Sequence, residues 1–107
     1  MEIVWTETGL DTLEEISDYI GEDSPINADR FIKEIYGKAD LLAGSPRIGH
    51  TPPEIEKSDI LQILHGEYKI LYRIDIDTDT VSILAVIHGK RDFKKIKLNF
   101  GDRFFPL

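Results

Sequence analysis

The sequence predicts an α+β fold in which a helical hairpin covers one face of an antiparallel sheet. Residues 67–76 alternate between polar and apolar side chains, and residues 80–87 form an apolar run, a combination typical of paired strands. Earlier, segments 6–20 and 25–42 carry apolar residues three or four positions apart, as amphipathic helices do. Helices gathered on one sheet face would bury all of these apolar patterns in a single core.

The chain opens with a short strand and a first helix. Glu2 to Trp5 is β-branched and aromatic, which favours a strand. Thr6 or Thr8 can cap a helix that runs to about Ile20. Gly21 is expected to end this helix, because glycine readily adopts the left-handed conformation that follows many helices. The apolar stripe of the helix consists of Leu10, Leu13, Ile16 and Ile20.

A second helix is predicted after a short turn. Ser24 is a favourable N-cap, and Pro25 suits the first helical position, where the missing N–H is not needed. The sequence Gly44-Ser45-Pro46 is expected to end the helix. The two helices should pack antiparallel, with most acidic side chains facing water. The apolar face of the second helix comprises Ala28, Phe31, Ile32, Ile35, Ala39 and Leu42.

Two β-hairpins are predicted after a loop at residues 47–59. A strand from Ile60 to Leu64 is followed by His65-Gly66, a sequence suited to a two-residue turn. That turn pairs Leu64 with Glu67, Gln62 with Lys69 and Ile60 with Leu71. A second turn at residues 77–80 pairs Ile76 with Val81, Ile74 with Ile83, Tyr72 with Ala85 and Ile70 with Ile87. The second set of pairs is entirely apolar, which supports its register, because a one-residue slip would invert the two faces.

This register predicts a row of polar side chains on the sheet face turned away from the helices. Lys69 is expected opposite His88, with Gln62 beside them. Such a row could form a surface for an anion or a partner. The other cations expected nearby are Arg73, opposite Leu84, and Lys90 and Arg91, just past the strand end.

Two interpretations of these cations remain open. Cleavage of a phosphodiester needs cations that stabilise a charged transition state and a group that moves protons, and histidine is the natural proton carrier near neutral pH. Lys69, Arg73, His88 and Arg91 could supply these functions. Alternatively, Lys69 and Arg73 are solvated side chains paired with neighbouring acids, and Arg91 forms an ion pair with Asp92 that fixes a turn.

Length and composition indicate one ordinary globular domain. The chain has 107 residues, of which 41% are hydrophobic and 31% charged, so residues 1–107 are expected to form a single domain. Residues 98–107 form an apolar extension, and the tail after Arg91 should pack either on the protein itself or on another chain. There is no cysteine, and the three histidines lack metal-ligand spacing, so no metal or cofactor is expected.

Charge is unevenly distributed along the chain. The net charge is −7, but residues 1–46 contain 11 acidic and 3 basic residues, whereas residues 47–107 contain 9 acidic and 10 basic ones. There is no apolar run near the roughly 20 residues of a membrane span and no signal peptide, so a cytoplasmic protein without a membrane partner is expected. The cations within residues 88–97 are Lys90, Arg91, Lys94, Lys95 and Lys97.

Two motifs resemble the RelE/ParE superfamily of toxins from type II toxin–antitoxin (plasmid stabilisation) modules. They are Tyr-Lys-Ile-Leu-Tyr-Arg-Ile at residues 68–74 and His-Gly-Lys-Arg-Asp at residues 88–92. The order of a strand, an acidic helical hairpin, a Ser-Pro-Arg-Ile-Gly loop at residues 45–49 and further strands is also similar. The resemblance spans about residues 3–96. It implies a RelE/ParE-like toxin domain that inhibits growth and forms a hetero-oligomer with a cognate antitoxin.

The resemblance implies one of two activities. RelE-like toxins are ribosome-dependent mRNA endoribonucleases that use clustered Lys and Arg side chains, often with a Tyr or His. ParE-like toxins poison DNA gyrase. If the chain is a ribonuclease, its catalytic residues are Lys69, Arg73, His88 and Arg91. If it binds a protein target, the implied target-binding residues are Lys90, Arg91 and Lys94.

The ParE branch is the leading interpretation. Ile60 and Gln62 stand where the RelE branch has lysines, and Lys97 stands near the position of its C-terminal aromatic residue. A net charge of −7 also does not favour docking on RNA. We therefore expect a toxin that binds a protein target such as DNA gyrase. The alternatives are a RelE-like ribosome-dependent endoribonuclease and a degenerate, non-toxic module that only binds an antitoxin, so whether the chain is an enzyme stays open.

Overall fold

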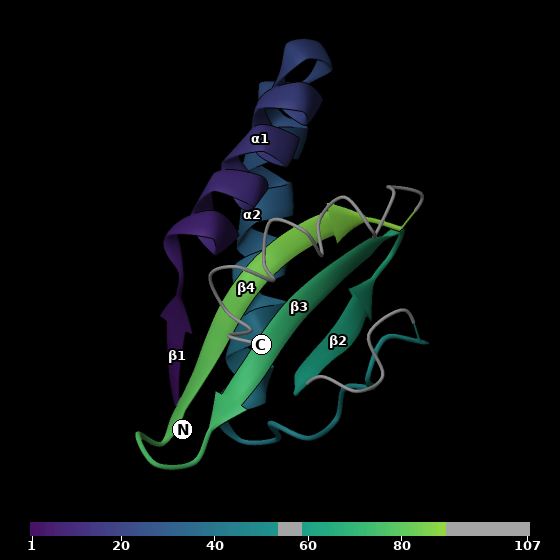
Figure 1. Ribbon diagram of the computed structural model, residues 1–107. Coiled ribbons are helices and arrows are strands. Elements are labelled where there is room, and N and C mark those ends of the chain that lie inside the picture. The colour runs from purple at the N-terminus through teal and green to yellow at the C-terminus, as the bar shows by residue number, and fades with distance from the viewer. Residues whose placement is uncertain (54–58, 90–107) are drawn as a thin grey trace.

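The computed structural model describes residues 1–53 and 59–89 and places two helices against one face of a four-stranded mixed sheet (Figure 1). The strand order is β1-β4-β3-β2, with β1 parallel to β4 and the other neighbours antiparallel. The predicted α+β class is confirmed. The predictions for residues 90–107, including the apolar tail, lie outside the described residues. The elements are β1 (Glu2–Trp5), α1 (Glu7–Asp23), α2 (Pro25–Asp40), the 3-10 helix η1 (Leu41–Ala43), β2 (Ile60–His65), β3 (Tyr68–Asp75) and β4 (Thr80–His88).

The start of α1 lies directly against the edge of β4. Thr6 caps the helix by accepting the N–H of Gly9 at 3.0 Å, and its hydroxyl donates to the carbonyl of Ile83 at 2.8 Å. A Cβ on Gly9 would lie 2.5 Å from that carbonyl, so only glycine allows this approach. Thr12 then accepts the N–H of Val86 at 2.9 Å. Side chains at the start of the helix thus form hydrogen bonds with backbone groups of β4 that lie at and beyond the end of β1.

The turn between the helices corrects the predicted end of the first helix. The helix continues past Gly21 to Asp23, and its C-cap Ser24 also caps α2 by accepting the N–H of Asn27 at 3.2 Å. One serine therefore serves both helices, and no left-handed residue is needed. At Gly21, a Cβ would lie 3.6 Å from the Cβ of Ala28, so this glycine sits where the two helices pack closely.

The main core lies between the helical hairpin and the sheet. The predicted helix faces are largely confirmed, but Leu10 is 43% exposed and does not belong to the core. Buried apolar side chains also lie on the sheet face turned away from the helices, among them Leu71 and Ile87. The core residues are Leu13, Phe31, Ile35, Ala39, Leu42, Ile63, Ile70, Tyr72, Val81, Ile83 and Val86.

The register of the first hairpin differs from the prediction by two residues. The turn is Gly66-Glu67, not His65-Gly66, and Gly66 takes a positive φ of 59° at the first turn position. Glycine at this position allows a tight turn that matches the twist of the strands. The observed pairs are Leu64 with Lys69, Gln62 with Leu71 and Ile60 with Arg73.

The second hairpin also starts its turn earlier than predicted. Asp75 ends β3 and accepts the N–H groups of Asp77 at 3.1 Å and Thr78 at 3.4 Å, as aspartate often does at turns. Ile76 therefore lies in the turn, outside the sheet, and is 69% exposed. The observed pairs are Asp75 with Thr80, Ile74 with Val81, Arg73 with Ser82 and Tyr72 with Ile83.

Candidate functional site

The predicted alignment of Lys69 with His88 is wrong. A β-bulge between Leu71 and Tyr72 shifts the register again, so that Lys69 pairs with Ile87 and Tyr68 pairs with His88. Because neighbouring strand residues point to opposite faces, Lys69 belongs to the face turned away from the helices, and His88 belongs to the helix side. The predicted row of Gln62, Lys69 and His88 on one face therefore does not form, and Arg73 faces Ser82 rather than Leu84.

Lys69 and His88 nevertheless border the same hollow at the end of the sheet. The hollow has a volume of about 300 Å³ and lies where the β2–β3 turn meets the end of β4. Gly89 closes this corner by donating its N–H to the carbonyl of Glu67 at 2.7 Å. Side chains from both faces reach the hollow because the strands end there. Its lining residues are Leu64, Gly66, Glu67, Tyr68, Lys69, His88 and Gly89.

The imidazole of His88 contacts both Glu67 and Tyr68. Its Nε2 lies 3.3 Å from a carboxylate oxygen of Glu67, and its ring meets the ring of Tyr68 edge-on with centroids 5.2 Å apart. Tyr68 in turn packs against Phe31 of α2 at 4.8 Å. A carboxylate beside an imidazole holds the ring in one orientation. His88 could therefore take part in proton transfer or bind an acidic group.

The phenol of Tyr68 keeps its proton at neutral pH. Burial raises its pKa, and the negative charges of Glu67 and of ionised Tyr19 raise it further. Tyr68 can thus donate a hydrogen bond into the hollow but is a poor base. Neither Tyr68 nor Glu67 was predicted as a site residue. Placing Gly66 at the first position of the turn would have brought both to the end of the sheet beside His88.

A second histidine stands in the same row on the helix side. His65 ends β2 and pairs with Tyr68, which pairs with His88, so the row crosses three strands. The Nε2 of His65 lies 3.0 Å from a carboxylate oxygen of Glu34 on α2. This contact ties the end of β2 to the helix.

The neighbouring positions on the outer sheet face provide little cationic chemistry. Arg73 lies 4.0 Å from a carboxylate oxygen of Asp59. Ile60, directly opposite Arg73, is 1% exposed. Gln62 has a buried side-chain oxygen with no hydrogen-bond partner among the described residues. The predicted target-binding residues Lys90, Arg91 and Lys94 lie outside the part of the chain that the structure describes.

The loop before β2 is fixed by a buried tyrosine. The hydroxyl of Tyr72 donates to the carbonyl of Pro46 at 2.7 Å and accepts the N–H of Gly49 at 3.0 Å. Burial raises the pKa of Tyr72, although the Gly49 hydrogen bond and the nearby charge of Arg47 oppose that rise. A Cβ on Gly49 would meet this hydroxyl and would lie 2.6 Å from the carbonyl of Gln62. The Ser-Pro-Arg-Ile-Gly motif is therefore a structural element.

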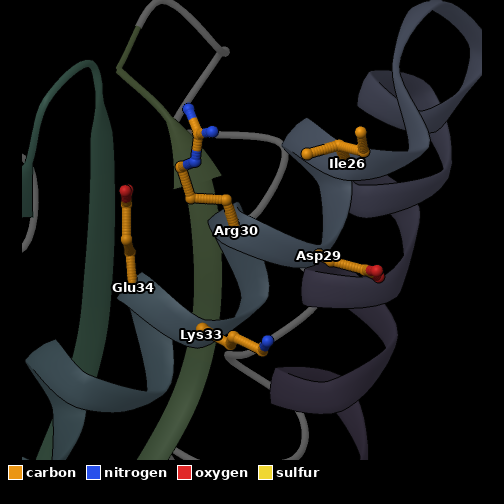
Figure 2. Close-up of a pocket in the computed structure, with 5 residues that line it drawn as sticks. All are labelled: Ile26, Asp29, Arg30, Lys33 and Glu34. Atoms are coloured by element: carbon orange, nitrogen blue, oxygen red, sulfur yellow. The ribbon is translucent and has the colours of Figure 1, made fainter.

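A larger hollow, of about 510 Å³, lies on the outer face of α2. Figure 2 shows that its side chains all come from this helix and spread apart rather than converge on one point. Because no second element contributes, we do not treat it as a site. Its lining residues are Ile26, Asp29, Arg30, Lys33 and Glu34.

Other kinds of site receive no support from the described ranges 1–53 and 59–89. In these ranges, no group of three or more His, Cys, Asp or Glu side chains is arranged to hold a metal ion. No helix within them has the length and apolar character that crossing a membrane requires.

Comparison with known proteins decides the family. Residues 3–93 match the model of the family described as ParE toxin of type II toxin–antitoxin system, parDE. The chain belongs to the ParE toxin family. The protein of Sinorhizobium fredii named Putative toxin Y4kP is 35% identical over 94 residues, which cover 88% of this chain and 94% of that protein. The chain is thus a toxin of the ParE/RelE superfamily of type II toxin–antitoxin systems.

Solved structures support the fold of this ParE-family chain. The toxin–antitoxin complex RelBE2 of Mycobacterium tuberculosis matches with 25% identity and a TM-score of 0.54, over 81% of this chain and 95% of that one. The intact E. coli RelBE complex matches with 17% identity and a TM-score of 0.57, over 84% and 98%. The isolated E. coli RelE toxin matches with 15% identity and a TM-score of 0.56, over 92% and 94%.

Proposed function

We propose that this ParE-family toxin acts by binding a protein target such as DNA gyrase and is neutralised by a cognate antitoxin in a hetero-oligomeric complex. The observation that carries the proposal is the match to the ParE family model over residues 3–93. Similar solved structures include two toxin–antitoxin complexes, which supports an antitoxin as partner. The target would be met in the cytoplasm.

The chemistry of the hollow agrees with a binding role. Its cation within the described residues is Lys69, and the imidazole of His88 is already engaged by Glu67. A phosphodiester entering the hollow would meet the carboxylate of Glu67, which repels negative charge. The outer face of β2 adds Ile60 and Gln62, not lysines. Transition-state stabilisation of RNA cleavage needs concentrated positive charge, and protein binding does not.

A RelE-like ribosome-dependent endoribonuclease is the second candidate. It is favoured by the contact between His88 and Glu67, because a carboxylate that orients an imidazole is a common device for proton transfer. In that case Lys69, Arg73, His88 and Arg91 would be catalytic. A degenerate, non-toxic module that only binds an antitoxin is the third candidate.

In the leading proposal, Lys90, Arg91 and Lys94 contact the target. Arg91→Ala should relieve toxicity while leaving the free energy of unfolding nearly unchanged. The matched control is Arg47→Ala, which removes an exposed cation from the loop before β2 and should leave toxicity intact. Unfolding of the Arg91 variant would instead assign this arginine a structural role.

Induced expression in a bacterial host tests the proposal. Growth arrest is expected, with relief on co-expression of the cognate antitoxin. Absence of growth arrest at a confirmed level of folded protein would favour the non-toxic module. Arrest accompanied by codon-positioned mRNA cuts in a cell-free translation extract would favour the ribonuclease.

A further inference from the structure

An exposed tyrosine stands near the turn between the two helices. Tyr19 lies one turn before the end of α1 and is 73% exposed. Figure 1 shows that this end of the helical hairpin extends past the sheet. Single exposed apolar side chains are common on protein surfaces, so the significance of this ring depends on its neighbours.

Tyr19 belongs to a group of rings that connects the hairpin with the end of the sheet. Phe31 of α2 packs against Tyr68 at 4.8 Å, and Tyr68 meets the ring of His88 at 5.2 Å. Burial, then the charge of Glu67, then the charge of ionised Tyr19 raise the pKa of Tyr68, so the two phenols lie near each other. We call Tyr19, Tyr68 and His88 the aromatic corner.

Carboxylates flank the aromatic corner on two sides. The helix α1 contains seven acidic residues and no basic one. Glu15 and Glu22 lie four residues before and three residues after Tyr19, so they share its helix face, and both are exposed. On the sheet, the carboxylate of Glu67 lies 3.3 Å from the imidazole of His88. A ligand that covers these rings therefore meets negative charge from both the helix and the sheet.

These features fit an arginine side chain. A guanidinium stacks on an aromatic face, and carboxylates beside the ring add charge pairing. Lysine makes the charge contact but not the planar stacking. Figure 2 shows that Arg30 of α2 extends away from α1, so an incoming cation is favoured on the α1 side of the corner, at Tyr19. Tyrosine and arginine are also enriched where binding energy concentrates in protein interfaces.

We propose that the protein target of this toxin contacts the aromatic corner and places an arginine on the ring of Tyr19, between Glu15 and Glu22. This rests on the proposed function, because it assumes a protein target. The proposed target contacts within residues 90–94 begin two residues after His88, so the two regions are continuous along the chain. The acidic residues of α1 would repel a nucleic acid. The antitoxin and a second copy of this chain are the alternative occupants that the tests must detect.

Three pools of short synthetic peptides test this chemistry directly. Each pool alternates alanine with one charged residue, which is arginine, lysine or glutamate. At about 0.15 M salt, where long-range charge attraction is screened, the full chain should bind the arginine pool about tenfold more tightly than the lysine pool. The glutamate pool should not bind. Equal binding of the arginine and lysine pools would indicate charge attraction alone and would overturn the proposal.

Matched variants locate the binding site. Tyr19→Ala should weaken binding of the arginine pool about tenfold, whereas Tyr19→Phe keeps the ring and should weaken it less than about twofold. Glu22→Gln should weaken it about threefold, whereas Glu2→Gln removes the same charge from an exposed position on β1 and should have little effect. Ile76→Ala, at a residue 69% exposed in the β3–β4 turn, is the control for a lost apolar side chain. Circular dichroism verifies folding, and equal losses in the control variants would contradict a defined site.

Inhibition of purified gyrase separates this proposal from the proposed function. If the unaltered chain inhibits supercoiling, Tyr19→Ala should need about tenfold more toxin for the same effect and should bind the antitoxin as tightly as before. Unchanged inhibition would overturn the proposal, and a loss of antitoxin binding alone would assign the corner to the antitoxin. If the unaltered chain does not affect gyrase, the proposed target fails, and the peptide pools alone decide whether the corner binds arginine. A dimer of the free chain that Tyr19→Ala dissociates would assign the corner to a second copy.

Discussion

Replacement of Tyr72 by phenylalanine tests how the loop before β2 is held. Tyr72 is fully buried, and its hydroxyl makes two hydrogen bonds, donating to the Pro46 carbonyl at 2.7 Å and accepting the Gly49 N–H at 3.0 Å. Phenylalanine keeps the ring in the core but removes both bonds. The loop backbone then has a donor and an acceptor without partners.

The expected loss follows from the cost of unpaired polar groups. A buried donor or acceptor that loses its partner costs about 1–3 kcal/mol. Gly49 and Pro46 are only partly buried, so water can compensate in part. The variant should therefore lose about 2 kcal/mol of unfolding free energy, which lowers the melting temperature of a domain of this size by about 10 °C.

Equilibrium urea unfolding measures this loss. The transition midpoint should fall while the slope with urea stays constant, because the same surface becomes exposed. Tyr36→Phe is the matched control. Tyr36 is an exposed residue of α2 that packs edge-on against Trp5 at 4.9 Å, so removing its hydroxyl should change stability by less than about 0.5 kcal/mol. Equal stability of Tyr72→Phe and the unaltered protein would refute the structural role of this hydroxyl.

Three further predictions concern stability. Gly9→Ala should lower the free energy of unfolding by about 2 kcal/mol, because the added carbon forces α1 away from β4. Gly37→Ala has no neighbour within 4 Å of the added carbon and should raise the free energy of unfolding by about 0.5–1 kcal/mol. Urea unfolding measures both changes. Thr12→Val should lower the free energy of unfolding by about 1–2 kcal/mol, because it leaves the N–H of Val86 unpaired. Thr12→Ser keeps the hydroxyl and should retain most of this stability. The raised pKa of Tyr72 favours its protonated form in the folded state, so stability should be full below pH 10 and fall above it, and Tyr72→Phe should reduce that alkaline loss.

The elements of the fold were predictable because their signals are local. Apolar residues at helical spacing marked the two helices, and Ser24-Pro25 marked the start of α2. Alternating side chains marked β3. The parallel pairing of β1 with β4 has no local signal, because it depends on how the chain crosses behind the sheet. Gly21 misled the prediction because it lies inside α1, facing Ala28 of α2, rather than at the helix end.

The site was harder to predict because its geometry depends on register. The two turns and the one bulge each shift the strand register by one or two residues relative to the prediction. Gly66 could occupy either turn position by sequence alone, and Asp75 gave no sign that it would expel Ile76 from the strand. The bulge after Leu71 then shifted the pairing back by one residue, which placed Lys69 opposite Ile87 and on the other sheet face from His88. Lys69 and His88 were predicted as site residues near the hollow, but their placement on opposite faces and the roles of Glu67 and Tyr68 were not.

Supercoiling by purified DNA gyrase tests the central claim most directly. With the purified toxin added, we expect supercoiling of a relaxed plasmid to fall in a dose-dependent way, while cell-free translation continues without mRNA cuts. Unchanged supercoiling together with codon-positioned mRNA cleavage would contradict the account and identify the chain as a ribosome-dependent ribonuclease.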